Sequence, residues 1–229
     1  MQHLAIIPDG NRRWAAANKL EAFWGHKKGL DAVELAIKVC LEQGVKFLTF
    51  YTFSLENFRR SETEKNYLFN EILAKEFTNA LPRLLEQNVR VRFLGDASYF
   101  PAVLQPVIVR VQEATAHCDA LTLNLLFCYG GRQEIAYAAR QLALKVAAGD
   151  LKPEAITDEL LATYLWTAGM PDPEIIVRTG NTSRLSNFLL YQGAYSEIIN
   201  LDCFWPDITE ARLKGCIDIF NATKRNFGT

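Results

Sequence analysis

The sequence predicts one α/β domain, residues 1–229, with a central, mostly parallel six-stranded sheet flanked by helices. Short runs rich in apolar, β-branched and aromatic residues alternate with longer segments of helical period, an alternation typical of parallel strands joined by helices. The short runs are almost continuously apolar, as expected of strands covered on both faces. A length of 229 residues and a hydrophobic fraction of 49% fit one domain with a sizeable core.

The elements follow in order along the chain, with no internal repeat or Gly/Ser linker between them. The stretch AIIPDGNRRWAAA, residues 5–17, runs from a buried strand into the start of a helix. Strands are expected at 3–7, 46–53, 89–95, 121–129, 174–180 and 196–202. Helices are expected at 26–43, 62–87, 98–117, 131–148, 158–166 and 207–225.

The segment 62–87 carries an apolar face wider than a surface helix needs, from Tyr67 and Leu68 to Leu84 and Leu85. Ordinary core packing explains such a face. One wall of an apolar tunnel, completed by strands that carry Phe50, Thr52 and Leu123, explains it as well.

Composition excludes several classes of protein. The net charge of −1 provides no global attraction for nucleic acid or an anionic membrane, so no nucleic-acid partner is expected and any basic site is local. No apolar run approaches the ~20 residues that span a bilayer, and the first residues lack a signal-peptide pattern. Five widely spaced cysteines without metal-ligand spacing predict free thiols in a reducing cytosol, hence a cytoplasmic protein.

Polar side chains follow four of the predicted strands, at 8–13, 54–60, 129–132 and 178–187. Ligands of open α/β sheets bind beyond the carboxyl ends of the strands, and these four segments combine arginine with glycine, serine or asparagine. Guanidinium groups suit phosphate oxygens, and glycine allows close approach of backbone N–H groups. The pattern therefore indicates a site for a polyanion with more than one phosphate group.

This site matches no standard nucleotide-binding motif, since neither GxxxxGK[ST] nor GxGxxG occurs. Asp9 stands beside Arg12 and Arg13, where a bare carboxylate would repel a diphosphate unless a divalent cation lay between them. Alternatively, Asp9 caps the following helix or stabilises the turn. The chemistry alone leaves both roles open.

The chain resembles the cis-prenyltransferases, and the bacterial undecaprenyl diphosphate synthases most of all. The resemblance runs from His3 to the closing RNFG. It rests on HLAIIPDGNRRWA, GHKKG, FYTFSLENFRR, LNLLFCYGGRQEI, IIVRTGNTSRLSNFLLYQGAYSEI and WPDI. It implies a parallel sheet with an apolar tunnel, a homodimer, and Mg2+-dependent condensation of isopentenyl diphosphate with an allylic diphosphate such as farnesyl diphosphate. The implied product is a long Z-polyprenyl diphosphate, undecaprenyl diphosphate for a cell-wall lipid carrier, with at most peripheral membrane contact for its release.

The resemblance also implies roles for individual residues. Asp9 and Asn57 are the implied catalytic residues, and Asp9 and Glu197 the implied Mg2+ ligands. The implied isopentenyl diphosphate site is formed by Arg178, Arg184 and Ser186. The allylic diphosphate is implied to bind at Gly10, Asn11, Arg12, Arg13, Trp14, His26, Ser54, Phe58 and Arg60.

Some positions depart from the family pattern. Ala22 stands where bacterial members usually have an arginine, for which Lys19 or Arg12 could compensate; Asn181 replaces a glycine and Ser183 a histidine. Pro8 stands where methionine is common, and Phe58 replaces tryptophan. The departures at Ala22, Asn181 and Ser183 favour, as an alternative, a short-chain or atypical head-to-middle prenyl diphosphate synthase of the same fold. A non-catalytic partner subunit is disfavoured, because the aspartate and the arginines are all present.

Overall fold

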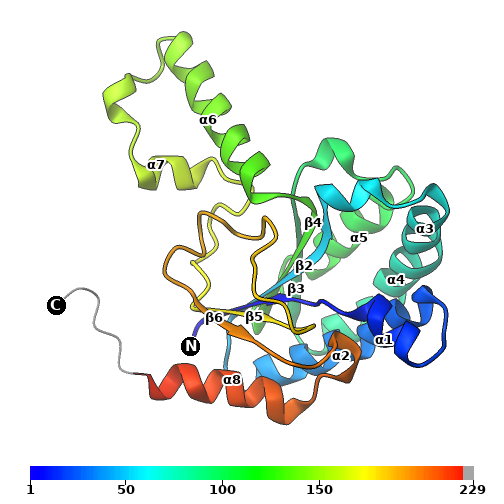
Figure 1. The fold of residues 1–229 in the computed structure, drawn as a ribbon. Coiled ribbons are helices and arrows are strands. Elements are labelled where there is room, and N and C mark those ends of the chain that lie inside the picture. The colour runs from blue at the N-terminus through cyan, green and yellow to red at the C-terminus, as the bar shows by residue number, and fades with distance from the viewer. Residues whose placement is uncertain (224–229) are drawn as a thin grey trace.

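The computed structural model describes residues 1–223 and contains one six-stranded sheet, in the order β3-β4-β2-β1-β5-β6. Every strand pairing in it is parallel, which confirms the predicted sheet (Figure 1). All six predicted strands form, with ends that differ by a few residues from those expected. They are β1 (His3–Ile7), β2 (Phe47–Ser54), β3 (Val89–Leu94), β4 (Leu121–Tyr129), β5 (Ile175–Arg178) and β6 (Glu197–Asn200).

The helices between the strands differ from the predicted ones mainly at their ends. In Figure 1, α6 and α7 project away from the sheet, whereas α2 and α8 lie along it. The α-helices are α1 (Asn11–Ala17), α2 (Ala22–Glu42), α3 (Glu62–Asn66), α4 (Ala74–Glu86), α5 (Gln105–Thr115), α6 (Gly131–Ala147), α7 (Asp158–Thr163) and α8 (Glu210–Ala222).

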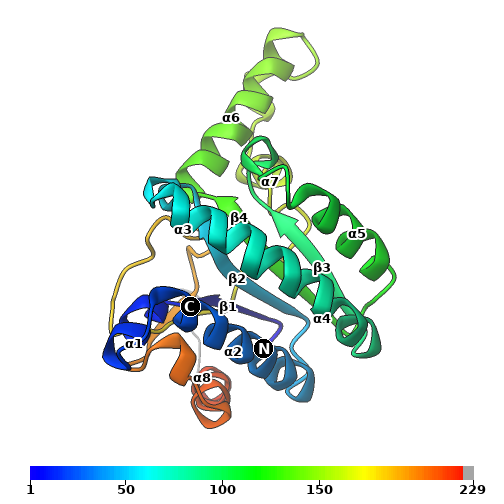
Figure 2. The same cartoon turned by 90° about the vertical axis from the view of Figure 1, so that its right-hand side faces the viewer.

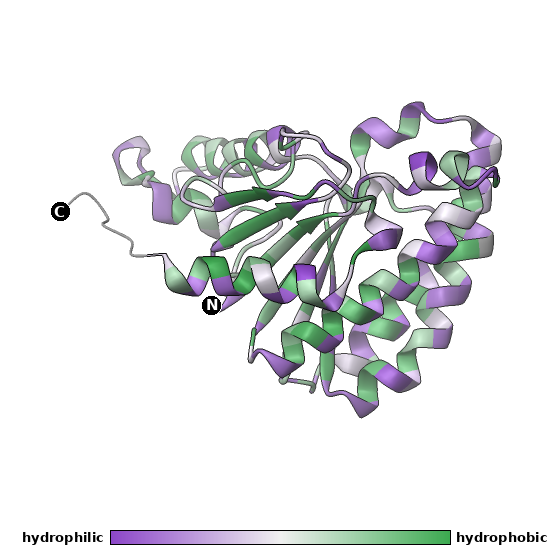
Figure 3. Cartoon of the chain, turned by 60° about the horizontal axis from the view of Figure 1, so that its bottom comes forward, coloured by the Kyte–Doolittle hydropathy of each residue, from purple (hydrophilic) through white to green (hydrophobic). Residues whose placement is uncertain are grey.

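The two faces of the sheet bury different partners. On β1, Leu4 and Ile6 join a large core with residues of α2, α4, α5 and α8, while Ala5 and Ile7 face the other way, as the two-residue period of a strand requires. The second face is covered by Phe188 and the chain around it rather than by a layer of helices. Figure 3 shows the strands as an almost uniformly hydrophobic layer.

The predicted helix 62–87 forms as one helical run, with a π-helical segment at Tyr67–Leu73 between α3 and α4. Figure 2 shows this run lying across one side of the sheet. A π-helical segment shifts the side chains that follow it around the helix axis, and periodicity does not reveal it.

Two other boundaries have local causes. Lys19 adopts a left-handed backbone conformation (φ 56°) that separates α1 from α2, so the second helix begins at Ala22 rather than at 26. The predicted helix at 207–225 begins at Glu210, where the Thr209 hydroxyl accepts a hydrogen bond from the Arg212 N–H; its predicted residues 224 and 225, and the RNFG motif, lie outside the described residues. Within residues 1–223, no helix is both long and apolar enough to cross a membrane.

Candidate active site

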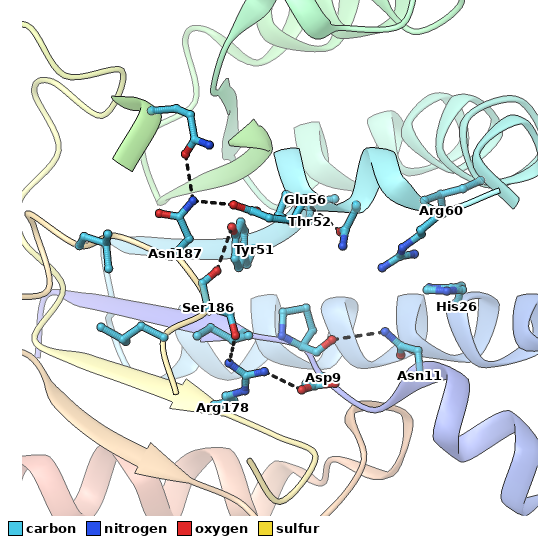
Figure 4. Close-up of a pocket in the computed structure, with 18 of the residues that line it drawn as sticks. Asp9, Asn11, His26, Tyr51, Thr52, Glu56, Arg60, Arg178, Ser186 and Asn187 are labelled. Atoms are coloured by element: carbon cyan, nitrogen blue, oxygen red, sulfur yellow. Dashed lines mark hydrogen bonds and ion pairs between the residues drawn. The ribbon is translucent and has the colours of Figure 1, made fainter. Parts of the chain in front are cut away.

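The loops at the carboxyl end of the sheet enclose a cavity of about 750 Å³, which we call the polar cavity. Its lining comes from the segments after β1, β2, β4 and β5, represented by Asp9, Ser54, Arg132 and Arg178 (Figure 4). Parallel strands place their carboxyl ends at one edge, so the four predicted polar segments meet at one site.

Asp9 lies at the centre of this edge as an ionised carboxylate. Its Oδ2 accepts a hydrogen bond from Arg178 Nη2 at 2.7 Å and its Oδ1 accepts one from Arg13 Nη2 at 3.1 Å. Burial alone would raise the pKa of Asp9, but the hydrogen bonds and charges of Arg178 and Arg13 outweigh it and hold that pKa below its ordinary value. Helix α1 has Gly10 at its N-cap and no side-chain cap, so Asp9 is not the helix cap that the sequence left open.

The backbone of Asp9 is fixed by Thr179, a residue that the sequence analysis did not single out. The Thr179 hydroxyl accepts a hydrogen bond from the Asp9 N–H at 2.9 Å and donates one to the Asp9 carbonyl at 2.7 Å. Thr179 is fully buried. The pair joins the ends of β1 and β5 and orients the carboxylate.

Arg178 connects Asp9 to the loop that follows β5. One guanidinium nitrogen donates to Asp9, and the other donates to Ser186 Oγ at 2.9 Å and to the Arg184 carbonyl. The Arg178 side chain is only 5% exposed, and its Nε is buried without a partner. These contacts give Arg178 an internal structural role in addition to its place in the lining of the polar cavity.

Much of the predicted allylic diphosphate set gathers around a second hollow of about 610 Å³, the arginine cavity. Arg12 and Arg60 approach the same Glu64 oxygen, at 3.9 and 3.3 Å. Ala22, which stands where bacterial family members usually have an arginine, also lines this hollow. Arg12 lines it too, whereas Lys19 does not, so of the two residues expected to compensate only Arg12 is in place. The predicted residues in the lining are Asp9, Gly10, Asn11, Arg12, Arg13, His26 and Arg60.

His26 lines both cavities as a neutral imidazole. Burial, together with the charges of Arg60 and Arg12, lowers its pKa to about 4. Its Nε2 and the Asn11 Oδ1 are buried polar atoms without a hydrogen-bond partner. Buried polar groups are normally satisfied; these two atoms are exceptions, and Asn11 Oδ1 is directed at Gly29 of α2.

The segment after β2 places its predicted residues on two sides. The Ser54 N–H donates to Asn57 Oδ1 at 3.2 Å in a capping box, and both residues line the polar cavity. Phe58 instead packs edge-to-face on Phe53 and faces a separate hollow. Trp14 likewise lines neither cavity; its indole N–H donates to Asp207 Oδ1 at 2.7 Å. The structure therefore gives Phe58 and Trp14 packing contacts outside the two cavities.

The loop after β5 explains one departure from the family. Asn181 adopts a left-handed conformation (φ 50°), which asparagine tolerates better than most residues, so it can replace the glycine. Ser183 is exposed, and its hydroxyl accepts a hydrogen bond from Asn200 at 3.2 Å. The Arg184 side chain is exposed and lines neither cavity, although the resemblance assigns it to isopentenyl diphosphate.

Glu197 is not brought to Asp9 within the chain. It opens β6 in register with Ile175, at the amino end of β5, whereas Asp9 follows the carboxyl end of β1. Among the side chains that the structure describes, no group of three or more His, Cys, Asp or Glu is arranged to hold a metal ion. The predicted pairing of Asp9 with Glu197 is thus not formed inside one chain, because the strand register separates them.

Asn187 is a second residue that the sequence analysis did not assign. Its Nδ2 donates to Glu56 at 2.8 Å and to Gln133 at 2.9 Å, and its Oδ1 accepts from the Arg132 N–H at 2.9 Å. It therefore joins the loops after β2, β4 and β5, as Figure 4 shows for Glu56. Only its position in a four-loop cluster could have revealed this role.

An apolar cavity of about 200 Å³ continues from the polar cavity beneath the run α3–α4. Its lining includes Phe50, Thr52 and Leu123 from the strands and Leu68 and Leu84 from the helical run. Of the two explanations for the wide apolar face, the cavity wall therefore applies in addition to core packing. The two cavities share a wall of Pro8, Asn11, His26, Thr52, Leu68 and Leu73.

The donor set at the carboxyl edge fits a magnesium ion. Mg2+ in phosphate sites is commonly held by one or two carboxylates together with substrate oxygens. Asp9 is a 28% exposed, ionised carboxylate that faces both hydrophilic cavities. The arginines around it suit the phosphate oxygens that would complete the coordination.

Comparisons with known proteins agree with this chemistry. Residues 7–228 match the family model described as "Putative undecaprenyl diphosphate synthase". The isoprenyl transferase of Rhizobium meliloti is 43% identical over 99% of this chain and 91% of its own length. The farnesyl-diphosphate-specific ditrans,polycis-undecaprenyl-diphosphate synthase of Micrococcus luteus is 40% identical, with the same coverage.

Two crystal structures share the fold over the whole chain. Lavandulyl diphosphate synthase from Lavandula x intermedia, in complex with dimethylallyl diphosphate, superposes with a TM-score of 0.95 at 31% identity. The match covers 98% of the plant enzyme's chain. A probable undecaprenyl diphosphate synthase from Campylobacter jejuni gives 0.82 at 33% identity and 99% coverage. Sequence, fold and site agree, and the chain belongs to the undecaprenyl diphosphate synthase family of prenyltransferases.

Proposed function

We propose that this protein condenses isopentenyl diphosphate with an allylic diphosphate, farnesyl diphosphate in the first instance, and makes undecaprenyl diphosphate. The observation that carries the proposal is the wall that the polar cavity, which contains Arg60, Arg132 and Arg178, shares with the apolar cavity. A substrate with a diphosphate head and a hydrocarbon tail has this same division. The Micrococcus luteus relative, 40% identical over nearly the whole chain, is named as specific for farnesyl diphosphate.

The diphosphate of the allylic substrate is assigned to the arginine cavity. Arg12, Arg13 and Arg60 would neutralise the charge that develops as the diphosphate departs, an effect larger in a site poor in water. Asp9 would hold Mg2+, which when bound adds positive charge at the phosphate oxygens. Asn11 and His26, each with one buried polar atom that has no partner, line the same hollow.

Isopentenyl diphosphate is assigned to the polar cavity. Arg178 and Ser186 line it, and Ser54 and Asn57 lie across it. From there the isopentenyl double bond would attack the allylic carbon as the diphosphate leaves, and loss of a proton would give the new cis double bond. Holding both reactants in this geometry supplies much of the rate. The tail would lengthen into the apolar cavity.

The short-chain or atypical alternative has one specific observation in its favour. The structure superposes better on lavandulyl diphosphate synthase than on the Campylobacter protein. Sequence identity favours the undecaprenyl product, since it is 40–43% to bacterial relatives and 31% to the plant enzyme. We give the sequence more weight, because a shared backbone accommodates different products.

We further propose a cytoplasmic homodimer. Ile198 on the edge strand β6 is 49% exposed, and Tyr195 just before this strand is 88% exposed. Exposed apolar side chains grouped at a sheet edge are suited to contact with a second copy of the chain. All five cysteines are free, as is usual in a reducing compartment. Light scattering after size exclusion should give twice the chain mass, and Tyr195→Glu should lower it.

Purified protein incubated with Mg2+, farnesyl diphosphate and labelled isopentenyl diphosphate tests the function. We expect label in extractable lipid, its loss with EDTA, and a C55 product by mass spectrometry. Dimethylallyl and geranyl diphosphates serve as competing allylic substrates. A short product from either, in preference to farnesyl diphosphate, would support the alternative, and absence of any incorporation would contradict the proposal.

A further inference from the structure

An ion pair joins the two helices that border the apolar cavity. Arg83 of α4 donates to the Glu34 carboxylate of α2 through both guanidinium nitrogens, one of them at 2.9 Å. Both residues line the cavity, and their side chains are 52% and 50% exposed. The pair therefore lies where the apolar cavity reaches the surface.

This pair lies near the end of the cavity that is remote from the diphosphate site, and the lining extends about one turn further, to Ile37 and Gln87. On α2, His26 belongs to the wall shared with the polar cavity, and Glu34 follows eight residues later, about 12 Å along the helix. On the facing run, Leu73 belongs to the shared wall and Arg83 lies ten residues further, about 15 Å. Chain growth from the shared wall is thus directed towards the pair.

The cavity is too small for a long product. Its volume of about 200 Å³ is below the ~300–1,000 Å³ of pockets that hold drug-sized ligands, and a C55 chain is larger than such a ligand. A product of that length must pass out between α2 and α4, where Glu34 meets Arg83. The chain can do so only when this pair separates.

We propose that the Glu34–Arg83 pair closes the side of the tunnel near its far end and limits product length. This inference rests on the proposed function. Further additions compete with product release, so an extra requirement to open the pair favours release. A half-exposed ion pair changes an equilibrium by at most about fivefold, and bidentate geometry places this one towards the upper part of that range.

The test compares the products of Glu34→Gln, Arg83→Gln and the exchanged double variant Glu34→Arg/Arg83→Glu. The fraction of chains longer than the main wild-type product should rise about two- to fivefold in each single variant and return towards the wild-type value in the exchange. Arg83→Lys, which keeps the charge without the bidentate contact, should give a smaller rise. Lys38→Gln is the matched control: Lys38 also bridges from α2, to Glu210 at 3.0 Å, but lies outside the cavity lining.

A second measurement does not depend on turnover. Calorimetric affinity for geranylgeranyl diphosphate should rise two- to fivefold in the single variants, while affinity for dimethylallyl diphosphate stays unchanged. An unchanged or shortened product distribution, or an exchange variant that behaves like the single ones, would overturn the proposal. If the wild-type enzyme makes no polyprenyl product, the function fails, and the affinity ratios still decide the role of the pair.

Discussion

Replacing Asp9 with asparagine should remove most prenyl transfer while the chain still folds. The change keeps the size of the side chain but removes the charge that faces Arg178 at 2.7 Å and Arg13 at 3.1 Å. Removing one group that stabilises the charge of the transition state lowers turnover by about 10²–10³-fold, and we expect at least that loss here.

The effect on stability follows from the same contacts. Removing one partner of a buried pair costs ~3–5 kcal/mol, and the Arg178 side chain is 5% exposed. Asp9 is 28% exposed and Arg178 keeps its bonds to Ser186 and the Arg184 carbonyl, so we expect roughly 1–3 kcal/mol after screening by water.

Initial rates of label transfer and urea unfolding measure the two effects separately. Asp202→Asn is the matched control, because Asp202 pairs with Arg212 at 2.7 Å on the surface; it should change neither rate nor stability measurably. A folded Asp9→Asn protein with near wild-type turnover would refute the role of Asp9.

Three further predictions concern the loops and a buried histidine. Asn187→Ala should lower stability by about 1–3 kcal/mol and kcat/KM more than tenfold, because it leaves the Glu56 carboxylate, the Gln133 amide oxygen and the Arg132 N–H without this partner. Thermal melts and steady-state rates check this, and unchanged values would contradict it. Asn181→Val should cost about 1–2 kcal/mol through its left-handed backbone, whereas Asn181→Gly should be neutral or stabilising; equal melting temperatures of the two variants would argue against strain. Burial lowers the pKa of His3 to about 4 against 6.5 when unfolded. The unfolded chain therefore binds a proton first, and stability should fall by up to about 3 kcal/mol between pH 7 and pH 4. Urea unfolding at several pH values gives the slope of the unfolding free energy against pH. In His3→Gln this slope should correspond to about one proton fewer taken up on unfolding, and an unchanged slope would exclude His3 as the source.

The fold was predictable because each strand carries its own signal. Residues 121–129 are apolar or aromatic except for Thr122 and Asn124, and they bury nearly every side chain, as a central parallel strand must. The carboxyl-edge rule then brings Asp9, Ser54, Arg132 and Arg178 together without any knowledge of the packing.

Other features depend on interactions that local patterns do not contain. The bond between Thr179 and the Asp9 backbone spans 170 residues, and the partners of Asn187 come from two other loops. The separation of Glu197 from Asp9 follows from the register of β5 and β6, which the spacing along the chain does not specify. The π-helical segment interrupts a periodicity that otherwise predicts a plain helix.

The chain between β5 and β6 has consequences for how the enzyme responds to mild stress. Ser186 and Asn187 both have positive φ, and this stretch contains no regular helix or strand. Its conformation therefore depends on hydrogen bonds such as those from Arg178 to Ser186 and from Asn187 to Gln133, rather than on a repeating backbone pattern. The conformational entropy of this segment is lost when the protein folds, so substrate binding does not have to order it. Such a segment can open locally below the global transition. Activity should therefore disappear at a lower urea concentration than the helical signal, so that the enzyme becomes inactive before it unfolds.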